Sequence, residues 1–320
     1  MNKKTSLQKF VTVYEKVGIL FILLIEIAVF ALSNQNFMTV NNLFLVARQV
    51  SFTGIAAVGM TMVLLVGEID ISVGSILAFT GCLCATLITK RGASIGGAFA
   101  AAIALSCLFG LVTGLLVAIV KIPSLIATLA MQTIIKGCTY LMTGGASVPG
   151  IPDAYKFLGQ GFVLDVIPVP VIVMVVVFLI GFLFLGKTYI GRRIYAVGGN
   201  QEAARLSGIR TKAIVVGTFV ASAATAGIAG ILMAARLGTG QPSTGSDFAM
   251  DVLTAVVLGG VSLQGGKGSV SHVFVGSLII GILANGLVML NVLEYWQWII
   301  KGIVFLLAVA ISNIGSYNKG

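Results

Sequence analysis

Apolar residues are gathered into ten long runs along this chain, and this pattern limits its fold more than any other feature. A helix needs about 20 apolar residues to cross a bilayer, and only 9% of the residues are charged, against about a quarter in soluble domains. The sequence predicts an all-α fold, a polytopic membrane helical bundle of about ten transmembrane segments. The runs are 17–33, 49–66, 73–89, 94–120, 122–143, 166–186, 213–236, 250–263, 270–291 and 296–314.

The charges between the runs predict the orientation of the bundle. Lys and Arg are retained on the cytoplasmic side of a membrane. With both termini inside, most basic residues fall in the cytoplasmic pieces, whereas the outer loops are balanced in charge. We therefore predict an N-in, C-in protein. The run 250–263 is too short to span alone and is compatible with a re-entrant segment. The predicted cytoplasmic pieces are 1–16, 67–72, 121, 187–212, 264–269 and 315–320.

The chain leaves no room for a soluble domain. Its longest stretches outside the runs are 144–165 and 187–212. We predict an N-terminal tail, 1–16, a transmembrane domain, 17–314, and a C-terminal tail, 315–320. Any energy-supplying domain must come from another polypeptide. The net charge of +10 is explained by cytoplasmic loops, so we expect no nucleic-acid partner.

The loop 187–212 carries six basic residues and one acidic residue. Its second half predicts a short helix. Asn200 can cap it, Glu202 lies in the first turn, Ala203 and Ala204 favour helix, and Gly208 can end it. A short, stiff, amphipathic helix at the cytoplasmic surface is suited to contact with another protein.

Two glycine-rich polar turns interrupt the apolar pattern. In residues 67–75, Asp70 and Ser72 precede the run that starts at Val73. They either form part of a gate in a broken helix or simply cap the next helix. The turn 264–268 resembles a phosphate-binding loop but lacks the Ser or Thr after its Lys, so ATP binding there is not expected. The gate or pathway candidates are Gly67, Asp70, Ser72, Gly74, Gly265 and Gly266.

Glu26, Lys136 and Lys301 are charged residues inside predicted spans. Glu26 and Lys136 are mid-span, where a charge costs about 2.5–3.5 kcal/mol and marks a bundle interior or a watery cavity. For Lys301, near a helix start, snorkelling to the interface is the favoured interpretation. The four cysteines lie in apolar runs, and the chain contains a single His. Neither a metal site nor a catalytic centre is therefore predicted.

Three motifs together resemble the permease subunits of ribose-type ABC sugar importers. They are Gly-Glu-Ile-Asp-Ile-Ser-Val-Gly-Ser (67–75), Gly-Arg-Arg-Ile-Tyr-Ala-Val-Gly-Gly-Asn followed by Glu-Ala-Ala-Arg-Leu-Ser-Gly-Ile (191–209), and Ala-Val-Val-Leu-Gly-Gly-Val-Ser-Leu-Gln-Gly-Gly-Lys-Gly (255–268). The resemblance extends over about residues 40–312. Glu68 departs from it, since family members often have Gly there.

The resemblance implies a sugar-importing permease of the bacterial cytoplasmic membrane that is not itself an enzyme. It implies a second permease copy, an extracytoplasmic sugar-binding protein, membrane lipid around the spans, and a separate ATPase subunit that holds ATP and Mg, so this chain needs no cofactor. The segment expected to dock into the ATPase contains Gly199, Asn200, Glu202, Ala203, Ala204, Arg205 and Gly208.

Two other function classes can be weighed against this one. An ion-coupled secondary transporter of a small polar solute would need intramembrane carboxylates, and Glu26 is the only mid-span candidate. An intramembrane enzyme would need a cluster of acid, His or Ser–Lys groups at one depth, and the sequence shows none.

Overall fold

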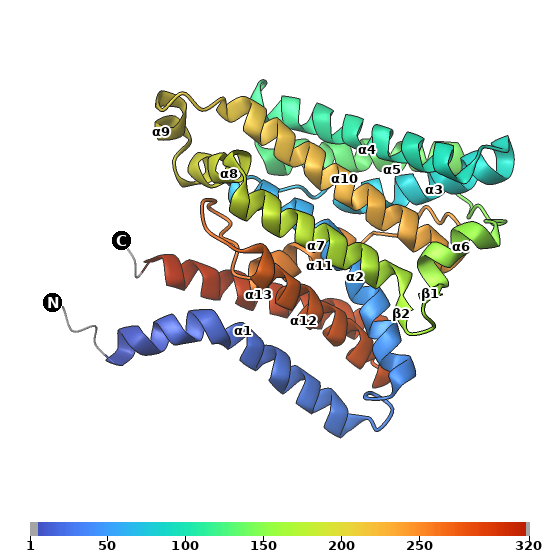
Figure 1. Ribbon diagram of the computed structural model, residues 1–320, viewed down its shortest axis with the longest axis horizontal. Helices are drawn as coiled ribbons and strands as arrows, with labels where there is room; N and C mark the ends of the chain where they lie inside the picture. Colours follow the sequence, from blue (N-terminus) through green and yellow to red (C-terminus); the bar gives the residue numbers. More distant parts are fainter. Residues whose placement is uncertain (1–5, 318–320) are drawn as a thin grey trace.

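The structure, a computed structural model, is an all-α bundle whose helices run roughly along one long axis (Figure 1). It describes residues 6–317, with side chains described for 18–310; Lys3, Lys4 and Lys319 of the predicted tails lie outside the described residues. The elements are α1 (Ser6–Ser33), α2 (Val40–Leu65), α3 (Val73–Arg91), α4 (Ile95–Ala118), α5 (Ser124–Thr143), α6 (Asp153–Gln160), β1 (Phe162–Val163), β2 (Ile167–Pro168), α7 (Val169–Lys187), α8 (Tyr189–Gly199), α9 (Gln201–Leu206), α10 (Thr211–Leu237), α11 (Phe248–Leu258), α12 (Val270–Met289) and α13 (Glu294–Tyr317).

Seven helices of the described residues are long and apolar enough to cross a membrane: α2, α3, α4, α5, α7, α10 and α12. The other three predicted segments overlap α1, α11 and α13. Helix α1 begins at Ser6, so much of the predicted tail 1–16 is helical. Helix α11 has 11 residues and at 1.5 Å per residue reaches about 16 Å, half the thickness of the hydrocarbon core.

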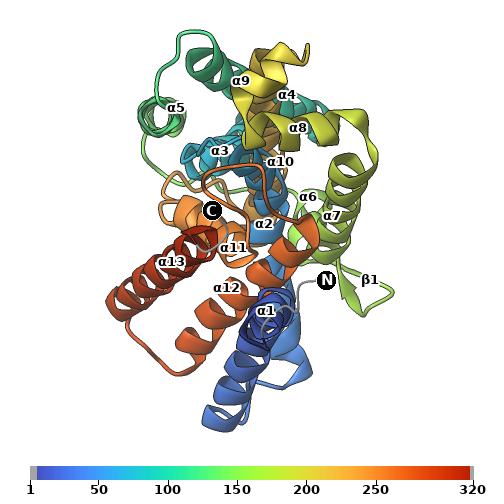
Figure 2. The same ribbon diagram turned by 90° about the vertical axis from the view of Figure 1, so that its left-hand side faces the viewer.

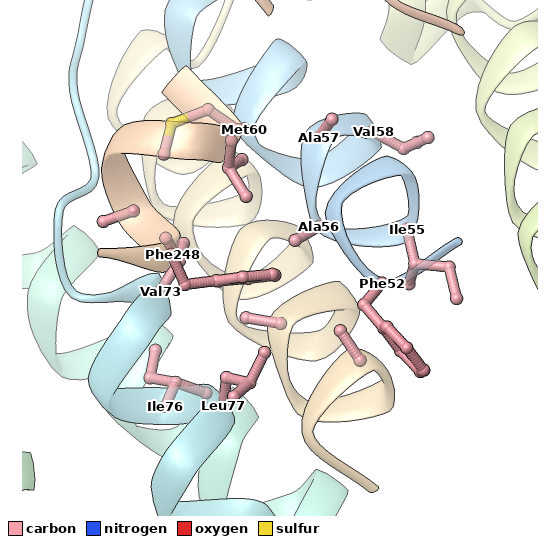
Figure 3. Close-up of a cluster of buried hydrophobic side chains, with 14 of the residues drawn as sticks. Phe52, Ile55, Ala56, Ala57, Val58, Met60, Val73, Ile76, Leu77 and Phe248 are labelled. Atoms are coloured by element: carbon pink, nitrogen blue, oxygen red, sulfur yellow. The ribbon is translucent and has the colours of Figure 1, made fainter. Parts of the chain in front are cut away.

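Helix α10 lies at the centre of the bundle and packs against α2, α3 and α4. Close packing of membrane helices relies on small residues at the contact, and α10 carries Gly227, Ala229 and Gly230 in its buried face. Beside it, Phe52 and Ile55 of α2 and Leu77 of α3 form part of a buried apolar cluster (Figure 3). This cluster fixes α3 against the bundle interior.

The two ends of the bundle have different composition. One end holds α6 and the β1–β2 hairpin, where Gln160 ties two helices together: its carbonyl accepts from Arg48 at 2.6 Å and its amide donates to Arg236 at 2.9 Å. The other end holds α8 and α9 (Figure 1). Helix α1 begins, and α13 ends, at the end that holds α8 and α9.

Buried polar pairs connect distant helices. Asn42 of α2 and Asn285 of α12 exchange two side-chain hydrogen bonds at 3.0 and 2.9 Å. For Lys301 of α13 we expected a side chain that snorkels to the interface. Its ammonium group instead pairs with Asp251 of α11 at 2.8 Å. This partner is 50 residues away in the sequence, so no local pattern indicated it. Because the two charges are paired, burying Lys301 costs less free energy than burying a lone charge.

Candidate functional site

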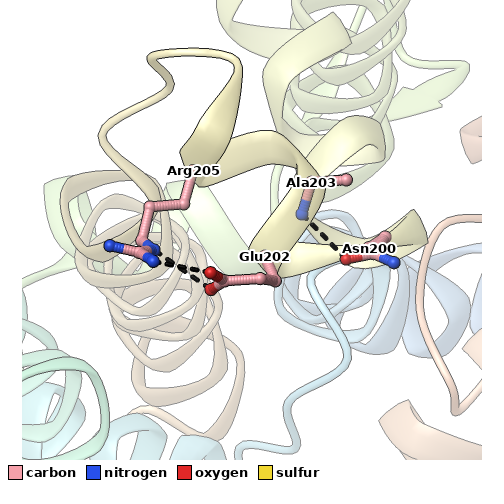
Figure 4. Close-up of polar contacts among 4 residues, drawn as sticks. All are labelled: Asn200, Glu202, Ala203 and Arg205. Carbon is pink, nitrogen blue, oxygen red and sulfur yellow. Dashed lines mark hydrogen bonds and ion pairs between the residues drawn. The ribbon is translucent and has the colours of Figure 1, made fainter.

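The loop 187–212 folds into two helices at the end of the bundle. Thr188 caps α8, accepting from the Gly191 amide at 3.0 Å. Asn200 caps α9, accepting from the Ala203 amide at 2.9 Å (Figure 4). Gly208, with φ +82°, follows α9 in the left-handed conformation that favours glycine. The predicted cap, short helix and glycine stop are confirmed.

Helix α8 is the part of this loop that sequence reasoning missed. Its apolar residues Ile190, Ile194 and Val197 recur at helical spacing, and the last two are buried. This periodicity was sufficient to predict a helix from the sequence, but the basic Arg192 and Arg193 made the stretch resemble a polar loop without secondary structure. The consequence is that α9 is joined to the bundle by a rigid helix.

The face of α9 is exposed and charged. Arg205 donates through two nitrogens to the two carboxylate oxygens of Glu202, in one case at 3.0 Å, and about two thirds of each side chain is exposed (Figure 4). These hydrogen bonds lower the pKa of the Glu202 carboxyl. Of the helix residues only Ala204 is buried. The arrangement presents an ordered ion pair to the outside of the molecule rather than to the rest of the chain.

Three chain segments far apart in sequence meet at the C-terminal end of α8. The Gly266 amide donates to the Leu65 carbonyl at 2.9 Å. A Cβ atom at Gly198 would overlap that same carbonyl oxygen, and one at Gly265 would lie 2.9 Å from both the Gly198 oxygen and the Gly67 nitrogen. We call Gly67, Gly198, Gly265 and Gly266 the glycine junction. At Gly198, Gly265 and Gly266 only a residue without a side chain allows these backbones to approach so closely, and Gly67 has a positive φ of +85°.

The glycine junction links the surface helices to the bundle interior. Gly199, which leads into α9, lies beside Gly266. The Tyr195 hydroxyl of α8 donates to the Gly268 carbonyl at 3.0 Å. Gly67 opens the turn that precedes α3, and Gly265 follows α11. The start of α9 is therefore in direct contact with the turns that end α2 and follow α11.

Asp70 and Ser72 occupy the start of α3 but not as simple helix caps. Ser72 stands at the N-cap position, yet its hydroxyl makes no bond to a helix amide and donates instead to Asp70. The buried Asp70 carboxylate also accepts from the Ser72 amide at 3.0 Å and from the Ser222 hydroxyl of α10 at 2.8 Å. The predicted cap by Ser72 is wrong, because its hydroxyl oxygen accepts no hydrogen bond from a helix amide and the hydroxyl is turned to Asp70 instead. Asp70 anchors the turn to the central helix.

The predicted gate residues thus fall into two groups. Gly67, Gly265 and Gly266 meet in the glycine junction, whereas Gly74 is the second residue of α3 and lies against the Gly245 carbonyl. Sequence reasoning missed Gly198 and Gly245. The adjacent pair Gly198–Gly199 before a helix cap was a readable signal for a close backbone contact; no local signal marks Gly245.

Comparison with known proteins places the chain in a family. The model of the family described as "Branched-chain amino acid transport system / permease component" matches residues 42–309. The ribose import permease protein RbsC of Escherichia coli K12 is 43% identical over 300 residues, which cover 92% of each chain. RbsC of Bacillus subtilis 168 is 39% identical, covering 94% of each chain.

A third relative is the L-arabinose ABC transporter permease protein AraH of Azospirillum brasilense, 37% identical over 91% of this chain and 86% of its own. No solved structure matches the chain. Both the matched family model and these relatives extend over nearly the whole bundle. The chain therefore belongs to the family of ABC transporter permease components that includes the ribose import permeases.

Proposed function

We propose that this chain is the membrane permease subunit of an ATP-driven importer for a monosaccharide. The observation that carries the proposal is the rigid path from the exposed face of α9, through α8, to the glycine junction at the turns beside α3 and α11. Relatives named as ribose and L-arabinose permeases support a sugar as the solute. The chain supplies the pathway and the gate, and a partner supplies the free energy.

The partners follow from the two ends of the bundle. A separate ATPase, which holds ATP and Mg, docks on the segment Gly199, Asn200, Glu202, Ala203, Ala204, Arg205 and Gly208. A sugar-binding protein docks at the opposite end, near α6. A second copy of the chain closes the pathway. The exposed apolar residues of α4 and α7, such as Leu111 and Leu179, face membrane lipid.

The orientation that suits this function is N-in, C-in, in the bacterial cytoplasmic membrane. In it, the loop 187–212 faces the ATPase, and ten segments within a single transmembrane domain, 17–314, cross or enter the bilayer. Support comes from the position of α1's start and α13's end at the same end of the bundle as α8 and α9 (Figure 1), and from the six basic residues of the loop.

Alternating access then has a mechanical description. ATP binding brings the two ATPase subunits together and moves the docked α9 helices. Because α8 is rigid and contacts the glycine junction, the motion reaches the turn before α3 and the segment after α11. These two elements change their separation, and the pathway opens to one side of the membrane and closes to the other.

The function is tested by gentle extraction of the tagged chain from its membrane and identification of what accompanies it. An ATPase subunit and a solute-binding protein should co-purify, and vesicles that hold all components should accumulate sugar only with ATP. A chain recovered alone that accumulates solute on an ion gradient would contradict the proposal and favour a secondary transporter.

Glu26→Gln is expected to leave uptake within about twofold of wild type. Both carboxylate oxygens of Glu26 are buried and have no hydrogen-bond partner among the described residues. A neutral amide of similar volume removes a charge that is costly inside the membrane, and an ATP-driven importer does not need that carboxylate as an ion carrier. Uptake with and without an ionophore checks this. Complete loss with normal insertion would instead favour ion coupling.

A further inference from the structure

The segment between α10 and α11 enters the bundle without forming a helix. Gly240 pairs with Val148 near the α6 end and lies beside Cys82 of α3, while Gly245 lies against Gly74 of the same helix. Gly74 and Cys82 are eight residues apart on α3, which corresponds to about 12 Å. Residues 240–247 therefore run along α3 into the membrane, and the short α11 completes the crossing.

Irregular backbone at membrane depth is tolerated only where it is buried in protein or lines a water-filled cavity. Here it does line a cavity, of about 80 Å³, between the start of α3, residues 242–246 and α5. The polar side chains in its lining are Ser75 of α3, Gln132 and Lys136 of α5, and Thr244 and Ser246. Among the described residues that line it, none is acidic.

The charge of Lys136 indicates that the cavity lies on a face of α5 that is turned away from lipid. Lys136 lies well inside the 20-residue α5, is exposed, and has no ion-pair partner among the described residues. An ammonium group in lipid at that depth costs about 2.5–3.5 kcal/mol, so this face of α5 does not face lipid. Figure 2 shows α5 and α13 on the same side of the molecule, with α3 and α11 between them.

We propose that this cavity is the place where the permease itself binds the passing solute, a neutral, hydroxyl-rich monosaccharide. The inference rests on the proposed function and adds the contact residues. The Gln132 amide and the Lys136 ammonium donate hydrogen bonds to sugar oxygens, and the Ser75 and Thr244 hydroxyls both donate and accept. A polar solute stripped of water needs such partners to enter a membrane.

The walls of the cavity are attached to the glycine junction. The turn that begins at Gly67 leads into α3, whose Gly74 and Ser75 form one wall. Residues 242–246 form another wall and continue through α11 to Gly265 and Gly266. In this form the two walls touch at Gly74 and Gly245. Motion of α8 that separates the two turns widens the cavity. The movement that opens the pathway therefore also lets the sugar enter the cavity.

The test uses the whole complex, with ATPase and sugar-binding protein, in proteoliposomes. Lys136→Met and Gln132→Met keep side-chain length and helix propensity but remove the donors. In the double variant, sugar uptake should fall about tenfold, the effect of losing about 1.4 kcal/mol of solute contact. ATP hydrolysis stimulated by the loaded binding protein should stay within about twofold, so fewer sugars cross per ATP.

Two variants serve as controls. Thr133→Val changes the exposed residue next to Gln132 that does not line the cavity, and sugar transported per ATP should be unchanged. Lys136→Gln keeps a donor and should recover most of the uptake lost in Lys136→Met. Normal sugar transported per ATP in the double variant would overturn the inference, as would equal loss of uptake and hydrolysis, which indicates a purely structural role. Absence of ATP-dependent uptake in the wild-type complex would instead reject the proposed function.

Discussion

Glu202→Lys is expected to abolish sugar uptake while the chain still inserts into the membrane. The substitution removes the carboxylate that pairs with Arg205 and reverses the charge on the exposed face of α9. An exposed substitution of this kind rarely changes folding by more than about 0.5 kcal/mol, whereas like charges brought against a partner surface cost several kcal/mol. Arg205→Glu should have the same effect. Uptake, chain abundance in the membrane and ATPase co-purification are the measurements.

Two further variants separate docking from the stability of α9. Lys187→Gln changes a basic residue at the end of α7, outside the α9 face, and should transport normally. The exchange Glu202→Arg with Arg205→Glu keeps an ion pair within α9 but reverses its direction. If the ATPase recognises this face, the exchanged chain stays inactive; restored uptake would show that the pair only holds α9 together.

Gly74→Val is the second change for which a complete loss of uptake is expected. A Cβ atom at Gly74 would overlap the Gly245 carbonyl, a backbone atom that cannot rotate away. The valine either drives residues 242–246 from α3 or holds the two walls at one fixed separation, and overpacking of this kind costs about 1–3 kcal/mol. Uptake and trypsin sensitivity of the membrane-inserted chain measure both consequences, and Gly74→Ala should show a smaller form of the same defect.

The matched control is Gly217→Val on α10. Apart from its own turn of helix, a Cβ atom there meets no atom within 4 Å, so it carries the same helix cost of a β-branched residue without the clash. Transport by this variant should be close to wild type. If Gly74→Val also transports normally, the start of α3 does not move during the cycle, and Asp70 and Ser72 there only stabilise the helix end.

Local chemistry explains what was predictable from the sequence. The cap at Asn200 and the stop at Gly208 depend on neighbouring residues, and the apolar runs depend on length and composition, so both were readable. The proximity of Gly67, Gly198 and Gly266 depends on tertiary packing of segments about 70 to 200 residues apart, to which helix and turn propensities contribute nothing. For the same reason the sequence left open whether Asp70 belongs to a gate or to a helix cap, since its bond to Ser222 spans 152 residues.

The paired amides of Asn42 and Asn285 have a consequence for the synthesis of the chain. The two residues are 243 positions apart, so a ribosome that adds about 5–20 residues per second completes the second about 10 to 50 s after the first. During that interval the Asn42 amide has its local acceptor, the Phe37 carbonyl at 2.9 Å, but lacks its partner on α12. The amide pair between α2 and α12 therefore forms only after α12 has been synthesised, and a chaperone or the insertion machinery has that time in which to shield the Asn42 amide.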